Sequence, residues 1–385
     1  MTLDETVACI GAGHAGVQLA ESLRTEGFAG RIVLIDEQEH LPYSRPPLSK
    51  EFMTGTEMAP LPLKGASWYA AHDVTLHTGT RATSIDRERR RVHLEDGSAL
   101  GWNHLVLAQG ARARTLDVPG STLAGIHTLR TLNDAKGLRA PLARSNRVVV
   151  VGAGFIGLEF ACAARATGLD VTVVDPAGRA LARSVSSVTA AALVSRLEAA
   201  GTHFSFETSV LAFQGEDHVR RVLTSNGDLD ADLVVIGIGV VPRDELAHEA
   251  GLEVDGGIVV DSALLTSDPN ITAVGDLAVS SSTGARTECV QNAADQARYV
   301  AQRIVGKTAE QYAHVPRFWS HLGPNRLQIV GTWTGSDNSE LAGNPDGAFS
   351  IRHYRGSSLI AVESVNQPRE HMQARKALES RLSVA

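Results

Sequence analysis

The chain has 385 residues, enough for two or three domains of typical size. Hydrophobic residues make up 43% and charged residues 21%, which excludes wholesale disorder. The net charge of −7 argues against binding to nucleic acid or to a membrane surface, because both need a basic field.

The spacing of the cysteines and the hydropathy of the chain argue against further classes of protein. Cys9, Cys162 and Cys289 are widely spaced, so we expect no disulfide scaffold and no cysteine-rich metal site. Residues 1–6 are polar and do not resemble a signal peptide, and the apolar stretch at 148–158 is too short to cross a bilayer. The sequence therefore predicts a cytoplasmic protein with no membrane segment and no metal site.

The first elements follow a strand, turn, helix and strand order. Residues 7–10 are predicted to form a buried strand, 17–25 a helix and 31–36 a second strand. Short alternating strands follow between residues 75 and 104, and 105–108 is another buried strand. This order is typical of a Rossmann unit.

The turn before the first helix has the glycines that a dinucleotide needs. Gly11 permits the tight turn, Gly13 lets the backbone approach a phosphate, and Gly16 lets the helix pack on the strand. An acid about 20 residues further on binds ribose hydroxyls in such units. Asp36 and Glu37 both stand there. The sequence predicts a first dinucleotide site.

The same pattern recurs in the middle of the chain. Its strands and helix are predicted at 147–151, 158–167 and 171–175, and its glycines are Gly152, Gly154 and Gly157. Asp175 would accept hydrogen bonds from an adenosine ribose and repel a 2′-phosphate, which favours NADH over NADPH. Arg179 leaves NADPH open, because a guanidinium can bind that phosphate.

The predicted strands become antiparallel only after Gly306 and Lys307. A buried strand at 233–241 and another at 271–274, which leads into Gly275 and Asp276, precede a helix at 292–305. We then expect antiparallel strands at 327–333, 349–354 and 359–365, and a final helix capped by Asn366 with Pro368 in its first turn.

Several motifs occur in the order that one enzyme family shows. They occupy residues 42–50, 154–159, 290–298, 318–320 and 365–370. With them the chain resembles, nearly end to end, the FAD-dependent NADH:ferredoxin reductases of bacterial aromatic-ring dioxygenases and cytochromes P450. The resemblance implies an α/β fold, with two Rossmann-like dinucleotide-binding domains and a C-terminal α+β domain. The implied domains are 1–114 and 244–312 for FAD, 115–243 for NAD, and 313–385 for the C-terminal domain.

The resemblance also implies site residues. Lys50 and Glu159 would pair beside the flavin and act in catalysis, with Lys50 stabilising negative charge on the reduced ring. It favours Glu37 over Asp36 as the acid that holds the FAD ribose. The other cofactor-binding residues that we expect are His14, Ala15, Arg45, Ala82, Ala108, Gly110, Arg130, Phe155, Ile156, Gly239, Gly275, Asp276, Val290 and Trp319.

The implied activity is an electron relay. NADH would pass a hydride to FAD, which would pass single electrons to a [2Fe-2S] ferredoxin. No cysteine lies in residues 44–50, which argues against a disulfide reductase. Residues 317–323 depart from the family pattern, so two alternatives stay open: an NADH oxidase or small-molecule reductase without a protein acceptor, and an NADH-sensing flavoprotein. A monomer and a homodimer both fit.

Overall fold

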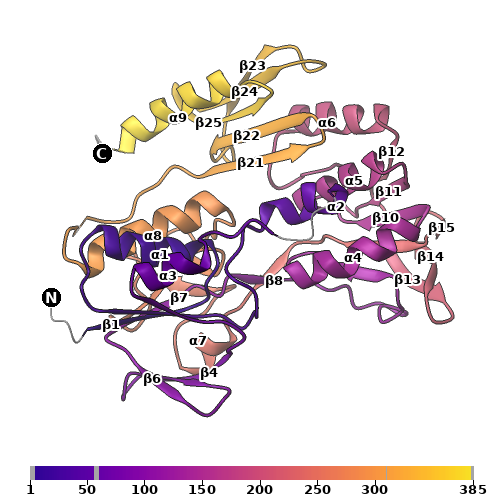
Figure 1. The fold of residues 1–385 in the computed structure, drawn as a ribbon. Helices are drawn as coiled ribbons and strands as arrows, with labels where there is room; N and C mark the ends of the chain where they lie inside the picture. Colours follow the sequence, from indigo (N-terminus) through magenta and orange to yellow (C-terminus); the bar gives the residue numbers. More distant parts are fainter. Residues whose placement is uncertain (1–4, 56–59, 309, 383–385) are drawn as a thin grey trace. The chain divides into compact units, whose positions relative to one another are not determined.

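The computed structural model describes residues 5–55, 60–308 and 310–382 (Figure 1). The chain divides into two compact units. Over the described residues, unit 1 comprises 5–44, 61–112, 241–308 and 310–314, and unit 2 comprises 45–55, 60, 113–240 and 315–382. The domain boundaries expected from the sequence differ from this division, because they place residues 45–60 with the first FAD segment, and they stay a prediction.

Unit 1 is built on a five-stranded parallel sheet. In sheet order its strands are β19 (Ile271–Ala273), β7 (His104–Leu107), β1 (Thr6–Ile10), β2 (Arg31–Ile35) and β3 (Val74–His77). The chain leaves β1 for β2 and β3 on one side and returns to β7 on the other. The crevice where the order reverses, beyond the carboxyl ends of β1 and β7, is where such sheets bind ligands.

Helices and small sheets complete unit 1. Helices α1 (His14–Thr25) and α8 (Val290–Ile304) pack against each other, and α3 (Ala66–Ala71) packs on β3. The further elements are α7 (Glu245–Glu249), an antiparallel sheet of β4 (Ala82–Asp86), β5 (Arg91–Leu94) and β6 (Ala99–Gly101), and a parallel pair of β18 (Ile258–Val260) and β20 (Ala278–Ser280).

Unit 2 repeats this plan. Its parallel sheet runs β12 (Thr202–Ser205), β11 (Asp170–Val174), β10 (Arg147–Val151), β16 (Leu233–Ile236) and β9 (Ile126–Thr128). An antiparallel sheet of β13 (Val210–Gly215), β14 (Val219–Thr224) and β15 (Leu229–Asp230) precedes β16, as β4–β6 precedes β7 in unit 1. The recurrence of the glycine turn therefore reflects a repeated architecture.

The remaining elements of unit 2 include an antiparallel C-terminal sheet covered by a helix. Its order is β21 (Arg317–Leu322), β22 (Asn325–Gly331), β25 (Ser358–Val365), β24 (Phe349–Arg355) and β23 (Asn338–Gly343), and α9 (Pro368–Leu382) packs on β25 and β22 (Figure 1). The helices are η1 (Pro46–Ser49), α2 (Glu51–Thr54), α4 (Leu132–Arg144), α5 (Phe155–Ala166) and α6 (Ser187–Ala199). The mixed α/β class expected from the sequence is confirmed.

Two sequence predictions are wrong in detail. The strand expected at 233–241 is two strands, β16 and β17 (Val240–Pro242), because Gly239 adopts φ +97° and turns the chain; β17 pairs with β8 (Ala111–Ala113). Asn366 does not cap the last helix. It has φ +56°, and its Oδ1 accepts a hydrogen bond from the backbone N of Arg326 at 2.8 Å.

Candidate functional site

The first glycine turn forms a cradle with no room for side chains. A Cβ on Gly11 would lie 2.3 Å from the carbonyl oxygen of Ala108, and one on Gly16 would lie 2.1 Å from that of Gly11. Gly11 also has φ +104°, which disfavours any other residue. Gly13 faces open space, with no atom within 4 Å of its Cβ position. This opening lies where a phosphate would approach.

Helix α1 begins at this opening. Its N-cap is Gly13, and no side chain caps it, whereas Thr131 and Ser186 cap α4 and α6 with their hydroxyls. The first N–H groups of a helix carry partial positive charge, so an uncapped glycine start suits an anion.

The acid that follows β2 is tied to the turn. Asp36 Oδ2 accepts a hydrogen bond from Ala12 N at 2.7 Å, and Oδ1 accepts one from Gln38 N at 2.9 Å. Glu37 instead forms an ion pair with Arg243, which comes from the third segment of unit 1. The two acids thus have different partners, and the preference for Glu37 at the FAD ribose stays a prediction.

Other expected residues of unit 1 gather around the same turn. Gly275 has φ +81°, and its N donates to the buried Gln296 Oε1 at 2.6 Å. A Cβ at Gly275 would lie 3.8 Å from that of Ala15. Asp276 follows directly, and Val290 is the first residue of α8, which packs on α1. The late return of the chain therefore brings Gly275 to the first glycine turn.

The second cradle, in unit 2, repeats the first. A Cβ on Gly152 would lie 2.5 Å from the carbonyl oxygen of Gly237, and one on Gly157 would lie 2.1 Å from that of Gly152. The Cβ position of Gly154 has only the Gly237 oxygen within 4 Å, at 3.8 Å, and α5 starts there without a side-chain cap. Residues and geometry again fit a pyrophosphate.

Asp175 takes the position that Asp36 takes in unit 1. Its Oδ2 accepts from Ala153 N at 2.7 Å and its Oδ1 from Ala177 N at 2.8 Å. The guanidinium of Arg179 is engaged with the neighbouring loop: Nη1 donates to the carbonyl of Val185 at 2.9 Å and Nη2 to that of Ala182 at 2.8 Å. Arg179 is therefore already used in holding this loop.

Lys50 and Glu159 form the ion pair that the resemblance implied. Lys50 Nζ lies 2.6 Å from Glu159 Oε2, and their side chains are 11% and 4% exposed. Nζ also donates to the carbonyl of Pro46 at 3.1 Å and lies 5.6 Å from the centre of the Trp319 ring. A buried ammonium held this way is a preorganised positive charge.

Two serines that sequence reasoning did not single out complete this group. Ser49 Oγ donates to Glu159 Oε2 at 2.5 Å, and Ser320 Oγ donates to Oε1 at 2.6 Å. Both serines are buried. Both lie inside motifs on which the resemblance rests, which is the one signal that could have found them.

Aromatic side chains border the second cradle in the same unit. The rings of Phe155 and Phe318 have centroids 4.2 Å apart, and Ile156 beside them is 42% exposed. The rings of Trp319 and His321 are 5.4 Å apart. The atypical segment 317–323 is thus mostly strand β21, with Gly323 turning at φ +57° into β22.

The other expected residues are placed as follows. In unit 1, His14 is the first residue of α1, Ala82 opens β4, Ala108 follows β7, and Gly110 has φ +68°. In unit 2, Arg45 precedes η1, Arg130 precedes α4, and Gly239 lies between β16 and β17. The FAD contacts expected of Arg45, Lys50 and Arg130 stay predictions.

The cysteines are poor nucleophiles. Burial raises the pKa of Cys9 and of Cys289 above the usual range, and burial together with the charge of Glu159 raises that of Cys162 to about 12. A thiolate is the reactive form of cysteine, so none of the three is activated at neutral pH.

Among the described residues, no group of three or more His, Cys, Asp or Glu side chains could hold a metal ion. Over that same part of the chain, no helix is both long and apolar enough to cross a membrane.

Comparison with known proteins agrees with this geometry. Residues 5–297 match the family "Pyridine nucleotide-disulphide oxidoreductase", and residues 317–385 match "Reductase C-terminal". Rhodocoxin reductase of Rhodococcus erythropolis is 44% identical, over 98% of this chain and 90% of that protein.

Two solved structures are also similar. The ferredoxin reductase for the CYP199A2 system of Rhodopseudomonas palustris has a TM-score of 0.94 and 43% identity, over 97% of this chain and 94% of the other. The covalent putidaredoxin reductase–putidaredoxin complex gives a TM-score of 0.93 and 38% identity, over 98% of this chain and 93% of the other.

Proposed function

The chain belongs to the pyridine nucleotide-disulphide oxidoreductase family, and from that premise we propose that it is an FAD-dependent NADH:ferredoxin reductase. The observation that carries the proposal is the pair of glycine cradles, one in each unit, each with an uncapped helix start and an acid after the second strand. Two dinucleotide sites in one chain suit electron transfer between two cofactors.

The two glycine turns and Lys50 would each have a task in this reaction. Bound FAD accepts a two-electron hydride from NADH and releases single electrons, so one NADH reduces two one-electron acceptors. The turn at Gly11–Gly16 would hold the FAD pyrophosphate, and the turn at Gly152–Gly157 that of NADH. Lys50, fixed by Glu159, would supply positive charge where the cofactor gains negative charge.

We infer a preference for NADH over NADPH. The Asp175 carboxylate, which accepts from the backbone N of Ala153 beside the second cradle, would repel a 2′-phosphate. Arg179, the residue that left NADPH open, has its donors directed to the carbonyls of Ala182 and Val185. Binding a phosphate would require it to give up these hydrogen bonds.

The proposed acceptor is a [2Fe-2S] ferredoxin. It rests on similarity to a ferredoxin reductase and to a reductase solved in complex with putidaredoxin. The second candidate is an NADH oxidase or small-molecule reductase. Strand β21 favours it, because its sequence departs from the family pattern and His321 is exposed on it.

One anaerobic experiment separates the two candidates. The purified holoenzyme is reduced with one equivalent of NADH, mixed with a [2Fe-2S] ferredoxin, and followed by stopped-flow absorbance. Flavin reoxidation in step with bleaching of the iron–sulfur centre supports the reductase. Reoxidation that waits for air or a small acceptor contradicts it and favours the second candidate.

We further propose a cytoplasmic location. Cys9 and Cys162 are free thiols, as is usual in a reducing compartment. Fractionation of the native host tests this: recovery of the enzyme outside the cytoplasmic fraction contradicts it.

A further inference from the structure

Three separate chain segments of unit 2 meet at the Glu159 carboxylate. Glu159 lies on α5, Ser49 and Lys50 are at the end of η1, and Ser320 is in the middle of β21. Both carboxylate oxygens are used: Oε1 by Ser320 at 2.6 Å, and Oε2 by Ser49 at 2.5 Å and by Lys50 at 2.6 Å. A carboxylate bonded on both oxygens has one orientation.

Because these groups are buried, the orientation of the Glu159 carboxylate strongly affects the charges around it. Ser320 is fully buried, Ser49 is 3% exposed and Glu159 is 4% exposed. A buried charge interacts strongly with its neighbours because water does not screen it. Removing one hydroxyl would leave Glu159 more negative toward Lys50, because one donor fewer would share the charge of the carboxylate.

We propose that Ser320, together with Ser49, is a positioning residue for hydride transfer: the two hydroxyls fix the Glu159 carboxylate and so set how much of the Lys50 charge reaches the flavin. This rests on the proposed function. Ser320 lies in the segment that matches "Reductase C-terminal". Through the hydroxyl of Ser320, that C-terminal segment would take part in positioning Glu159.

The chain offers a matched control for Ser320. Ser364 is a fully buried serine on β25 of the same sheet. Its Oγ has no hydrogen-bond partner within the described part of the chain. Ser364→Ala therefore deletes the same atom from the same sheet without touching Glu159.

The test measures the holoenzyme in four variants: Ser320→Ala, Ser49→Ala, Ser364→Ala, and Ser320→Thr, which keeps a hydroxyl. The readouts are the midpoint potential of bound FAD by dye equilibration, the rate of reduction by NADH, and the FAD dissociation constant. Because a hydrogen bond to a charged group affects an equilibrium by about tenfold or more, we expect Ser320→Ala and Ser49→Ala to slow reduction about tenfold. The matching tenfold change in the two-electron equilibrium lowers the potential by about 30 mV.

The pattern across variants decides the outcome. Lowered potentials in both alanine variants, recovery in Ser320→Thr, and no change in Ser364→Ala support the proposal. Potentials and rates in Ser320→Ala and Ser49→Ala equal to those of Ser364→Ala overturn it, even when all three lose stability. If Ser320→Ala loses FAD, Ser49→Ala decides alone. A wild-type flavin that NADH does not reduce overturns the proposed function itself, which is a separate result.

Discussion

At the scale of single residues, the clearest feature is the set of groups that surround the Lys50 ammonium. The ammonium has a carboxylate at 2.6 Å, a carbonyl at 3.1 Å and an aromatic ring at 5.6 Å. A second lysine has a similar set of partners: Lys64 pairs with Glu21 at 2.5 Å and lies 5.2 Å from the Trp68 ring centre. It differs in being 25% exposed rather than 11%.

Lys50→Met is expected to slow flavin reduction by NADH about a hundredfold, because losing a preorganised charge at a reaction centre has that order of effect. FAD binding should weaken much less. Stopped-flow reduction and FAD titration measure the two effects, and Lys64→Met is the control that should leave both near wild type. Loss of FAD with an unchanged reduction rate in the remaining holoenzyme would refute the assigned role of Lys50.

Substitution of two glycines of the first turn should have two different effects, one on stability and one on FAD binding. Gly11→Ala places a Cβ 2.3 Å from a backbone oxygen at φ +104°, so it should destabilise the apoprotein by several kcal/mol, roughly. Gly13→Ala meets no atom within 4 Å and should leave folding nearly unchanged while weakening FAD binding. Urea unfolding and FAD titration of both variants check this, and equal losses of stability would contradict it.

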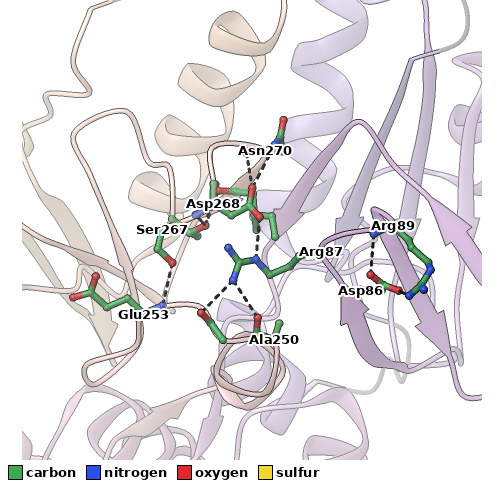
Figure 2. A network of polar contacts seen from close by, with 11 residues as sticks. Asp86, Arg87, Arg89, Ala250, Glu253, Ser267, Asp268 and Asn270 are labelled. Carbon is green, nitrogen blue, oxygen red and sulfur yellow. Dashed lines mark hydrogen bonds and ion pairs between the residues drawn. The ribbon is translucent and has the colours of Figure 1, made fainter.

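At the scale of elements, buried charges join segments that are distant in the sequence. Figure 2 shows the side chain of Arg87, which follows β4, directed at Asp268 and at the backbone carbonyls just after α7. Arg87 Nε lies 2.9 Å from Asp268 Oδ2, and Nη1 donates to the carbonyls of Ala250 and Gly251 at 3.4 and 3.3 Å. The loop that precedes β19 is thereby tied to the β4–β6 sheet.

Arg87→Met is expected to reduce the free energy of unfolding by about 2 kcal/mol, since it leaves the largely buried Asp268 without its cation. Arg89 is the control. It pairs with Asp86 at 3.0 Å but is 75% exposed, and exposed pairs contribute little, so Arg89→Met should change stability by less than about 0.5 kcal/mol. Urea denaturation measures the free energy of unfolding of both variants. Equal losses in the two would contradict the role assigned to Arg87.

Helix α6 is held to the C-terminal sheet by another buried charge. Glu363 is fully buried on β25 and accepts hydrogen bonds from Ser186 N at 2.7 Å and Ser186 Oγ at 2.8 Å, at the start of α6. His353 Nε2 lies 3.2 Å from its Oε1. Burial alone raises the pKa of Glu363, but the contacts with His353 and Ser186 outweigh it, and the pKa is lowered from 4.5.

A carboxyl whose pKa is lower in the folded state stabilises the fold above its unfolded pKa and loses that effect as pH falls. We therefore expect Glu363→Gln to cost about 2 kcal/mol at pH 7. The difference from wild type should shrink as pH drops below about 4.5. Urea unfolding from pH 7 to pH 3.5 tests this, with the exposed Glu340→Gln as control. A difference independent of pH would argue that Glu363 acts through packing alone.

At the scale of the whole molecule, each unit has its own sheet, core and glycine cradle, so each nucleotide should stabilise the protein separately. A ligand that binds only the folded state stabilises it by about 2.7 kcal/mol at a hundred times its dissociation constant. At the same concentration, FAD added to apoprotein should raise the melting temperature of wild type more than that of Gly13→Ala. Gly154→Ala should respond to FAD and not to NADH. Loss of both responses in either variant would contradict separate sites.

The sequence by itself determined much of this protein. Gly11 and Gly152 require positive φ, and Asp36 and Asp175 follow their strands at the expected spacing, so two Rossmann units were predictable from local physics. Local sequence patterns gave a wrong prediction where a side chain bonds a residue distant in the sequence. Asn366 resembles a helix cap, but its side chain bonds Arg326 on a neighbouring strand.

Only the tertiary structure decided which side chains meet. No spacing rule brings Ser49, Glu159 and Ser320 together, because η1, α5 and β21 are more than a hundred residues apart along the chain. Likewise, Arg179 could serve a phosphate or a loop, and only the positions of the Ala182 and Val185 carbonyls assign it to the loop. Glycine turns can be predicted from the local sequence, because backbone sterics determine them. The hydrogen-bond partners of a buried carboxylate depend instead on which elements pack around it.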